Sequence, residues 1–275
     1  MSSFQAAVLG AVQGLTEFVP ISSSGHLVLV PEALGWASPG LAFDVLLHVA
    51  SLIALIVYFR AELVAVITGA ARREPGARRL GALLLIGTIP AGVAGLALGD
   101  YFEDSFKDAD AAAVQLIVTA AILVIAELAL AYHRRRVSEE RLRGIDRLGV
   151  WDALLIGVAQ AISILPGISR SGATIGAGLA VSMRRDDAAR FAILLAIPAL
   201  LGAAIVELPE LRHVQLSYSA ATFGFLASLI TSYAAIAGLI RYLRTRTLYP
   251  FAAYCVVAGI AFLIFVPDRL VRIAG

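Results

Sequence analysis

The chain has 275 residues, of which 60% are apolar and only 15% are charged, and its mean hydropathy is +0.87. Soluble domains carry roughly 25% charged residues, so the composition excludes an ordinary soluble protein and predicts an integral membrane protein. The single cysteine, Cys255, excludes an internal disulfide, and the net charge of +2 says less than the positions of the charges.

The first apolar segment, 4–34, is interrupted in its middle. Residues 10–26 read GAVQGLTEFVPISSSGH, so Pro, Gly and Ser break the run where polar groups also gather: Gln13, Glu17, Ser22, Ser23, Ser24 and His26. Irregular backbone is not tolerated where it faces lipid. We therefore predict two half-helices that form a re-entrant hairpin packed inside a helical bundle.

Three uninterrupted apolar stretches follow, at 41–59, 80–99 and 111–132. About 20 apolar residues suffice to cross a hydrocarbon core of about 30 Å as a helix, so each is a predicted span. In the first of them Asp44 and His48 lie four residues apart on one face. They could line the mouth of a site or help to hold a metal, or they could form a hydrogen-bonded pair at a helix end. Small residues in the second span permit close helix contact and hence a homodimer: Gly92, Gly95 and Gly99.

A second interrupted segment, 150–183, repeats the first. Residues 157–173 read GVAQAISILPGISRSGA and align with residues 10–26 without a gap, so that Gly157 matches Gly10 and Gln160 matches Gln13. The polar residues here are Ser169, Arg170, Ser171 and Thr174. Three more predicted spans follow, at 191–208, 218–240 and 250–267. We therefore predict an all-α membrane protein with six transmembrane helices and two re-entrant hairpins.

Arginine positions predict the orientation. Four connecting segments hold 17 of the 22 basic residues: 60–79, 133–149, 184–190 and 241–247. By the positive-inside rule they are cytoplasmic, in contact with anionic headgroups rather than nucleic acid, and the acidic segment 100–110 is external. Successive connecting segments then lie on opposite sides of the membrane only if each interrupted segment enters and leaves the membrane on the same side.

The resulting architecture is a single membrane domain made of two inverted repeats, 1–140 and 147–275. Each repeat contains one hairpin and three spans, and the odd number of spans inverts the second repeat. Hairpin one therefore enters from outside and hairpin two from the cytoplasm, so that their tips meet in the middle of the membrane. Interrupted helices at matching positions of two repeats point to a binding site there.

The tips bring one arginine, one glutamate, one histidine and several hydroxyls together. A guanidinium inside the membrane is costly, and its fork of donors matches phosphate or carboxylate. The half-helix N-termini also favour anions, so we predict an oxyanion site with the parts that phosphoryl transfer requires. Simpler alternatives remain for single residues: Arg170 could be a structural partner of Glu17, His26 an interior imidazole, and the serines helix caps.

With these residues in hand, the chain resembles the undecaprenyl-diphosphate phosphatase, or bacitracin-resistance, family over essentially its whole length. The resemblance is carried by QGLTEFVPISSSGH at 13–26 and LPGISRSGATIGAG at 165–178, with support from FDVLLHVASLIA at 43–54 and GTIPAGVAGL at 87–96. It implies hydrolysis of a polyprenyl diphosphate lipid in the bacterial inner membrane, at a site that faces the periplasm or cell exterior, with a divalent cation, Mg²⁺ or Ca²⁺.

The resemblance also assigns roles. It places catalytic function on Glu17, Ser23, His26 and Arg170, and substrate contacts on Gln13, Ser22, Ser169 and Thr174. Ser24 and Ser171, which lie in the same two motifs, are further predicted substrate contacts. The family often has glutamate at the position of Gln13, so Glu17 is left as the charged metal ligand. Two nucleophiles remain open: Ser23 activated by His26, or His26 itself. A transporter or flippase of polyprenyl phosphate is the rival class, because inverted repeats with broken helices are typical of transporters.

Overall fold

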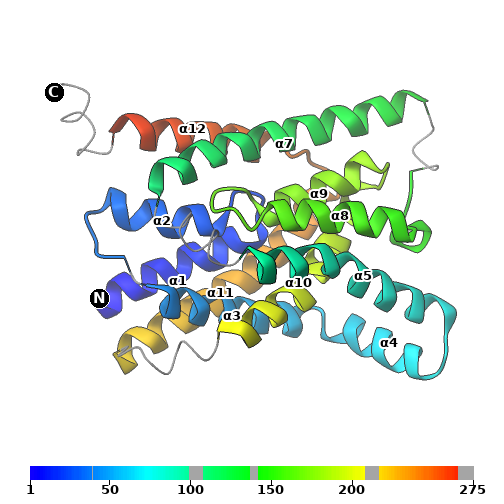
Figure 1. Ribbon diagram of the computed structural model, residues 1–275, viewed down its shortest axis with the longest axis horizontal. Helices are drawn as coiled ribbons and strands as arrows, with labels where there is room; N and C mark the ends of the chain where they lie inside the picture. Colours follow the sequence, from blue (N-terminus) through cyan, green and yellow to red (C-terminus); the bar gives the residue numbers. More distant parts are fainter. Residues whose placement is uncertain (39, 99–107, 137–141, 208–216, 266–275) are drawn as a thin grey trace.

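The computed structural model describes residues 1–38, 40–98, 108–136, 142–207 and 217–265. These residues contain eleven α-helices, one short 3-10 helix (Ile145–Arg147) and no β-strand (Figure 1). The prediction of an all-α protein is confirmed for them. The helices lie roughly along the long axis of the molecule and pack side by side.

Each of the six predicted spans coincides with a helix: α3 (Leu41–Tyr58), α5 (Pro75–Ala97), α7 (Ala109–Arg136), α10 (Arg185–Glu207), α11 (Tyr218–Leu243) and α12 (Tyr249–Phe265). The first five are long and apolar enough to cross a membrane. Helix α12 has 17 residues. The last residues of three predicted spans, 99, 208 and 266–267, lie outside the described residues, so the predicted helix contact at Gly99 does too. The chain is therefore a multi-pass membrane protein.

Two of the predicted connecting segments are partly helical. Segment 60–79 begins with helix α4 (Arg60–Ala71), which contacts α5, and α10 begins inside segment 184–190. Residues 60–71 contain no proline and several good helix formers, and arginine itself favours helix. Arginine content indicates the side of the membrane, not whether the backbone is helical. In the acidic segment 100–110, all residues before 108 lie outside the described residues.

Both interrupted segments form helical hairpins. Helices α1 (Ser3–Phe18) and α2 (Ser23–Ala33) run in opposite directions in one half of the molecule, and α8 (Val150–Ile162) and α9 (Arg170–Ala180) do so in the other half (Figure 1). The helix breaks fall where Pro, Gly and Ser predicted them. Ser22, with φ 67°, and Gly167, with φ 95°, adopt left-handed backbone conformations at the two turns.

Matched glycines seat the two hairpins against matching helices. A Cβ atom on Gly10 of α1 would lie 2.9 Å from the carbonyl carbon of Gly224 in α11. A Cβ atom on the matching residue, Gly157 of α8, would lie 2.9 Å from the carbonyl carbon of Gly87 in α5. The first helix of each hairpin thus packs on the middle span of the other half, which interlocks the two halves.

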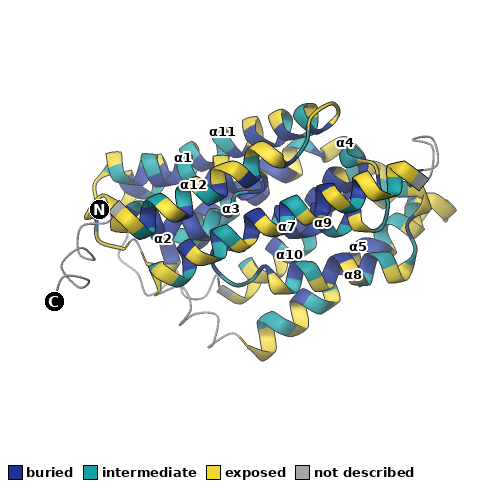
Figure 2. Ribbon diagram, turned by 90° about the horizontal axis from the view of Figure 1, so that it is seen from above, coloured by how far each residue is buried: buried dark blue, intermediate teal, exposed yellow. Residues whose placement is uncertain are grey.

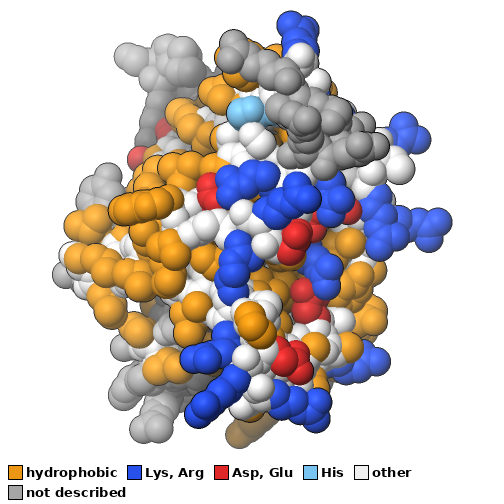
Figure 3. All heavy atoms as spheres, turned by 90° about the vertical axis from the view of Figure 1, so that its right-hand side faces the viewer, with side chains coloured by type: hydrophobic (Ala, Val, Ile, Leu, Met, Phe, Trp, Pro, Cys, Tyr) orange, Lys and Arg blue, Asp and Glu red, His pale blue; other side chains and the backbone are white. Residues whose placement is uncertain are grey.

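The surface is apolar along the helices and arginine-rich at one end. Buried positions face the interior of the bundle and exposed ones face outward (Figure 2), and the exposed ones include large apolar side chains such as Leu85, Leu96 and Ile205. The helix ends next to the four arginine-rich segments lie at one end of the molecule, where arginines gather (Figure 3). This distribution suits a bundle surrounded by lipid.

Candidate active site

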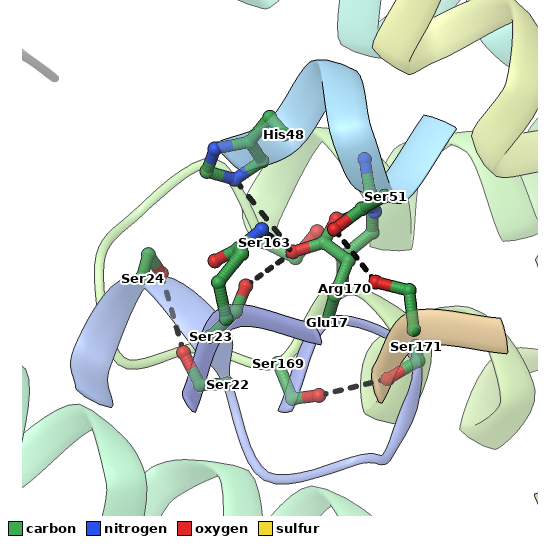
Figure 4. Close-up of polar contacts among 12 residues, drawn as sticks. Glu17, Ser22, Ser23, Ser24, His48, Ser51, Ser163, Ser169, Arg170 and Ser171 are labelled. Carbon is green, nitrogen blue, oxygen red and sulfur yellow. Dashed lines mark hydrogen bonds and ion pairs between the residues drawn. The ribbon is translucent and has the colours of Figure 1, made fainter. Parts of the chain in front are cut away.

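The tips of the two hairpins touch. A Cβ atom on Gly25 of α2 would lie 3.1 Å from the Cα atom of Gly167 in the turn before α9. The hydroxyl of Ser171 donates to the carbonyl oxygen of Val19 at 3.1 Å, which ties α9 to the other turn. The residues of the two motifs therefore converge from opposite halves of the chain, as the inverted repeat predicts (Figure 4).

Glu17 is the centre of the polar cluster. Its side chain is only 2% exposed. Its Oε2 atom accepts hydrogen bonds from the Ser23 hydroxyl at 2.5 Å and from Nε2 of Gln13 at 2.9 Å, and Nε2 of His48 lies 3.6 Å away. Arg170 donates to the Oε1 atom. A buried carboxylate is costly unless it is paired, and these donors compensate it.

Arg170 both pairs with Glu17 and stays accessible. Its ion pair with Glu17 agrees with the simpler prediction that Arg170 is a structural partner of that carboxylate. However, the arginine side chain is 21% exposed, and only one terminal nitrogen of its guanidinium takes part in the pair. Within the part of the chain that the structure describes, the other guanidinium nitrogens have no hydrogen-bond partner. A guanidinium with open donors can bind a phosphate while it faces the carboxylate.

The first serine of each motif, Ser22 or Ser169, caps the second helix of its hairpin. The Ser22 hydroxyl accepts from the backbone N–H of Gly25 at 3.3 Å, and the Ser169 hydroxyl accepts from Gly172 at 3.1 Å. Ser24 and Ser171 lie 3.2 Å from these capping hydroxyls, one pair in each motif. Capping thus accounts for Ser22 and Ser169, and their predicted contact with substrate stays a prediction.

Thr174 does not reach the Glu17 cluster through its hydroxyl. The side chain is buried, and its Oγ1 atom donates to the carbonyl oxygens of Arg170 at 2.7 Å and Ser171 at 3.3 Å, within its own helix. Back-bonding of this kind is common for threonine in helices. Thr174 thus lies one helical turn after Arg170 and bonds to its backbone carbonyl, and a direct contact of Thr174 with substrate stays a prediction.

His26 and Ser23 are not paired with each other in the structure. The Nδ1 atom of His26 lies 2.7 Å from the carbonyl oxygen of Ser22, and its Nε2 atom lies 2.7 Å from the hydroxyl of Tyr254 in α12. Ser23 bonds to Glu17 instead. The predicted activation of Ser23 by His26 therefore differs from this arrangement, in which Glu17 takes the position of the base.

His48 joins the cluster, while Asp44 supports it. The Nδ1 atom of His48 lies 2.7 Å from the backbone carbonyl oxygen of Asp44, which turns Nε2 toward Glu17. The two residues share one helix face, as their spacing predicted. His48 of α3 thus lies next to Glu17, and Asp44 orients it through its backbone; a place at the mouth of the site or a role in holding a metal stays a prediction.

A divalent cation fits this donor set only in part. No group of three or more His, Cys, Asp or Glu side chains gathers as a metal site within the described ranges. The oxygen donors at hand are the carboxylate of Glu17 and the Oε1 atom of Gln13, which is buried and has no hydrogen-bond partner. Mg²⁺ is usually held by one or two carboxylates together with substrate phosphates. These residues therefore fit a cation whose other ligands belong to the substrate.

Comparison with known proteins identifies the family. The family model described as bacitracin resistance protein BacA matches residues 6–261. The chain belongs to the BacA family. The BacA match spans both hairpins, so the motif residues that converge in the structure all lie inside it.

Similar proteins carry one name. The undecaprenyl-diphosphatase of Myxococcus xanthus is 40% identical over 273 residues, which cover 96% of this chain and 89% of the relative. That of Alcanivorax borkumensis is 41% identical and covers 96% of this chain and 98% of its own length. That of Synechococcus elongatus is 42% identical, with 93% and 90% covered. The family resemblance of the sequence is confirmed.

The sequence predicted neither the place of Tyr254 at this BacA-family site nor the burial of Gln160 without partners. Tyr254 lies in the last span, far from either motif, and its only sequence signal is an isolated hydroxyl in an apolar helix. Gln160, the counterpart of Gln13, is buried, and neither amide atom has a hydrogen-bond partner. Its repeat position was visible in the sequence, but its missing partners are a property of packing.

Proposed function

We propose that this protein hydrolyses undecaprenyl diphosphate to undecaprenyl phosphate and inorganic phosphate. The reaction recycles the lipid carrier of peptidoglycan and other cell-wall polymers, and it confers resistance to bacitracin. The observation that carries the proposal is the contact between the two motifs. Arg170 of hairpin two meets Glu17 of hairpin one next to the Ser23 hydroxyl, inside a membrane protein of the BacA family.

The proposed setting is a bundle of six spans with two re-entrant hairpins in the bacterial inner membrane. At 1.5 Å per residue, α1 is about 24 Å long and α2 about 16 Å, both shorter than a hydrocarbon core of about 30 Å. The arginine-rich end is then cytoplasmic, and hairpin one enters from the opposite side. The site faces the periplasm or cell exterior, where the used lipid carrier is released.

In the proposed reaction Ser23 is the nucleophile and Glu17 is its base. As the Ser23 Oγ atom attacks the terminal phosphorus, its proton passes to Glu17. The bond between that phosphorus and the bridging oxygen breaks, and undecaprenyl phosphate departs with the proton. A water molecule then attacks the phosphoserine, Glu17 takes a proton from it, and that proton returns to Oγ as inorganic phosphate leaves.

Arg170 and the helix N-termini stabilise charge in this scheme. The open donors of Arg170 face the phosphate oxygens while α2 and α9 direct their N-terminal N–H groups toward the same space. Gln13 and Glu17 would hold Mg²⁺ or Ca²⁺ together with substrate oxygens, and such a cation neutralises the charge of a diphosphate. His26 is the alternative nucleophile, and it would first have to release the hydroxyl of Tyr254.

Release of inorganic phosphate tests the proposal. Purified protein in detergent is expected to release phosphate from farnesyl diphosphate with added Mg²⁺ or Ca²⁺, and Ser23→Ala is expected to release none. Protein that is folded and binds the lipid but yields no phosphate would contradict hydrolysis and support the rival transporter class. A transporter would need the positive charge of Arg170 to bind phosphate, but it would not need a serine hydroxyl that is hydrogen-bonded to a carboxylate.

A further inference from the structure

The imidazole of His26 is fixed at both nitrogens. A carbonyl oxygen can only accept a hydrogen bond, so the contact of Nδ1 with the Ser22 carbonyl places a proton on Nδ1. In the neutral ring Nε2 is then an acceptor, and the Tyr254 hydroxyl is its donor at 2.7 Å. The two bonds together select one tautomer and one ring orientation.

The ring of Tyr254 also lies next to the imidazole. The two ring centroids are 5.6 Å apart and the ring planes differ by only 11°. His26 is 7% exposed, whereas Tyr254 is 44% exposed. The tyrosine therefore lies between the imidazole and the outside of the bundle, and it contacts the site from the last span of the second repeat.

The hydroxyl of Tyr254 is a polar group in an otherwise apolar helix, so it needs a hydrogen-bond partner. The remaining residues of α12 are apolar apart from Tyr249 at its first position. Phenylalanine would fill the same space, and a hydroxyl without a partner in an apolar setting is costly. The next residue, Cys255, places its Sγ atom 3.9 Å from the carbonyl oxygen of Pro20. Consecutive residues of α12 thus contact both α2 and the turn of hairpin one.

We propose that Tyr254 is the positioning residue for His26. Its hydroxyl holds the imidazole in the tautomer with a proton on Nδ1. That proton binds the carbonyl oxygen of Ser22, the residue before the proposed nucleophile Ser23, so the Tyr254 hydroxyl stays on Nε2 during turnover and the turn keeps its geometry. The kinetic consequence rests on the proposed hydrolysis, whereas the tautomer does not depend on any activity.

Tyr254→Phe removes the hydroxyl and keeps the ring. We expect kcat for a prenyl diphosphate to fall by about tenfold, the effect of losing roughly 1.4 kcal/mol in the transition state, with KM within about twofold of the wild type. Tyr249→Phe is the matched control, because Tyr249 lies in the same helix with 43% exposure, and it should leave both constants unchanged. A kcat within about twofold of the wild type, or a change in KM alone, would overturn the proposal.

Nitrogen-15 NMR of histidine-labelled protein gives an independent readout. The chain has four histidines, and the spectrum of His26→Gln identifies the His26 signals by their loss. At about pH 8, above the ordinary histidine pKa, His26 should show a protonated Nδ1 and an unprotonated Nε2. The Nε2 resonance should move in Tyr254→Phe and stay in Tyr249→Phe. A protonated Nε2 in the wild type, or no movement, would sink the proposal even if the hydrolysis is correct. If the protein hydrolyses no diphosphate, these spectra alone decide it.

Discussion

Burial of the Glu17 carboxylate costs free energy, and the partners that compensate this cost are also the groups of the proposed reaction. Its two carboxylate oxygens receive a hydroxyl, an amide and a guanidinium, so its burial is compensated by partners from three segments of the chain. One of these partners, Ser23, is a nucleophile, and another, Arg170, keeps donors open to a ligand. The groups that stabilise the buried carboxylate are thus the groups that the proposed reaction uses.

Arg170→Lys tests whether the guanidinium fork matters beyond its charge. An ammonium keeps the charge next to Glu17 but cannot bind a phosphate in two-pronged geometry. We expect phosphate release to fall by about 10²-fold or more, the usual effect of removing a preorganised donor from a transition state. The measurement is kcat/KM for a prenyl diphosphate, with the thermal stability of each protein determined alongside.

Arg190→Lys is the matched control for that change. Arg190 pairs with Glu62 at the arginine-rich end and its side chain is 48% exposed, so lysine there should leave kcat/KM unchanged. If Arg170→Lys keeps near-normal turnover, Arg170 is only a structural partner of Glu17.

At this scale the sequence predicted the members of the site better than their pairing. The repeat identified Glu17, Ser23, His26 and Arg170, because polar residues in an apolar run need a reason. It could not indicate that Ser23 would bond to Glu17 rather than to His26. His26 instead bonds to Tyr254, which lies 228 residues further along the chain and reaches it through the packing of α12.

At the scale of helices, the hairpins depend on two matched glycine contacts. Gly10 and Gly157 occupy the same place in the two copies of the motif, and each lies against the backbone of a glycine in the other half. Association of helices inside a membrane relies on such close packing, since lipid provides no hydrophobic drive between them. These glycines therefore allow the first helix of each hairpin to pack closely on a helix of the other half.

Gly10→Ala is expected to destabilise the protein. The added methyl group would lie 2.9 Å from the carbonyl carbon of Gly224, so α1 or α11 must shift, at a cost of roughly 1–3 kcal/mol. Thermal unfolding in detergent measures the change. Gly92→Ala is the control, because a Cβ atom there has no atom within 4 Å and alanine favours helix. Equal stability of Gly10→Ala and the wild type would refute the close packing.

The sequence predicted helices well and connections less well. Long apolar runs located a helix at each predicted span, five of them long and apolar enough to cross a membrane, and the Pro, Gly and Ser breaks located the turn of each helix pair. The helix at 60–71 was not predicted, because its charges were used only to assign the side of the membrane. This short helix has no distinct apolar face and buries only Gly69, so the sequence offers no periodic signal for it, although it contacts α5.

For the whole molecule, the decisive feature is that an inverted repeat needs hairpins that do not cross the membrane. Phe4 and Ala33, at the two ends of hairpin one, should then lie on the same side, and Arg72 on the other. Single cysteines at these positions, in a protein with Cys255→Ala, can be labelled in intact cells with a membrane-impermeant thiol reagent. We expect labelling of Phe4→Cys and Ala33→Cys from outside, and of Arg72→Cys only after permeabilisation. Labelling of residues 4 and 33 from opposite sides would exclude the re-entrant hairpin.

Removal of divalent cations tests the proposed cofactor at the same scale. With a single carboxylate at the site and a substrate that carries a diphosphate, charge neutralisation by Arg170 alone is incomplete. We expect EDTA to abolish phosphate release and Mg²⁺ or Ca²⁺ to restore it, without a change in the thermal stability of the substrate-free protein. Full activity in chelator would remove the cation from the scheme.

Identification of the phosphorylated residue tests the central claim most directly, that two hairpins from opposite halves build one phosphatase site around Ser23. Turnover of a prenyl diphosphate labelled in its terminal phosphate is stopped by rapid quenching, and the modified peptide is located by mass spectrometry. The account predicts an acid-stable phosphate on Ser23, which disappears in Glu17→Gln and in Arg170→Ala. An acid-labile phosphate on His26, or phosphorylation that persists without Glu17 and Arg170, would contradict it.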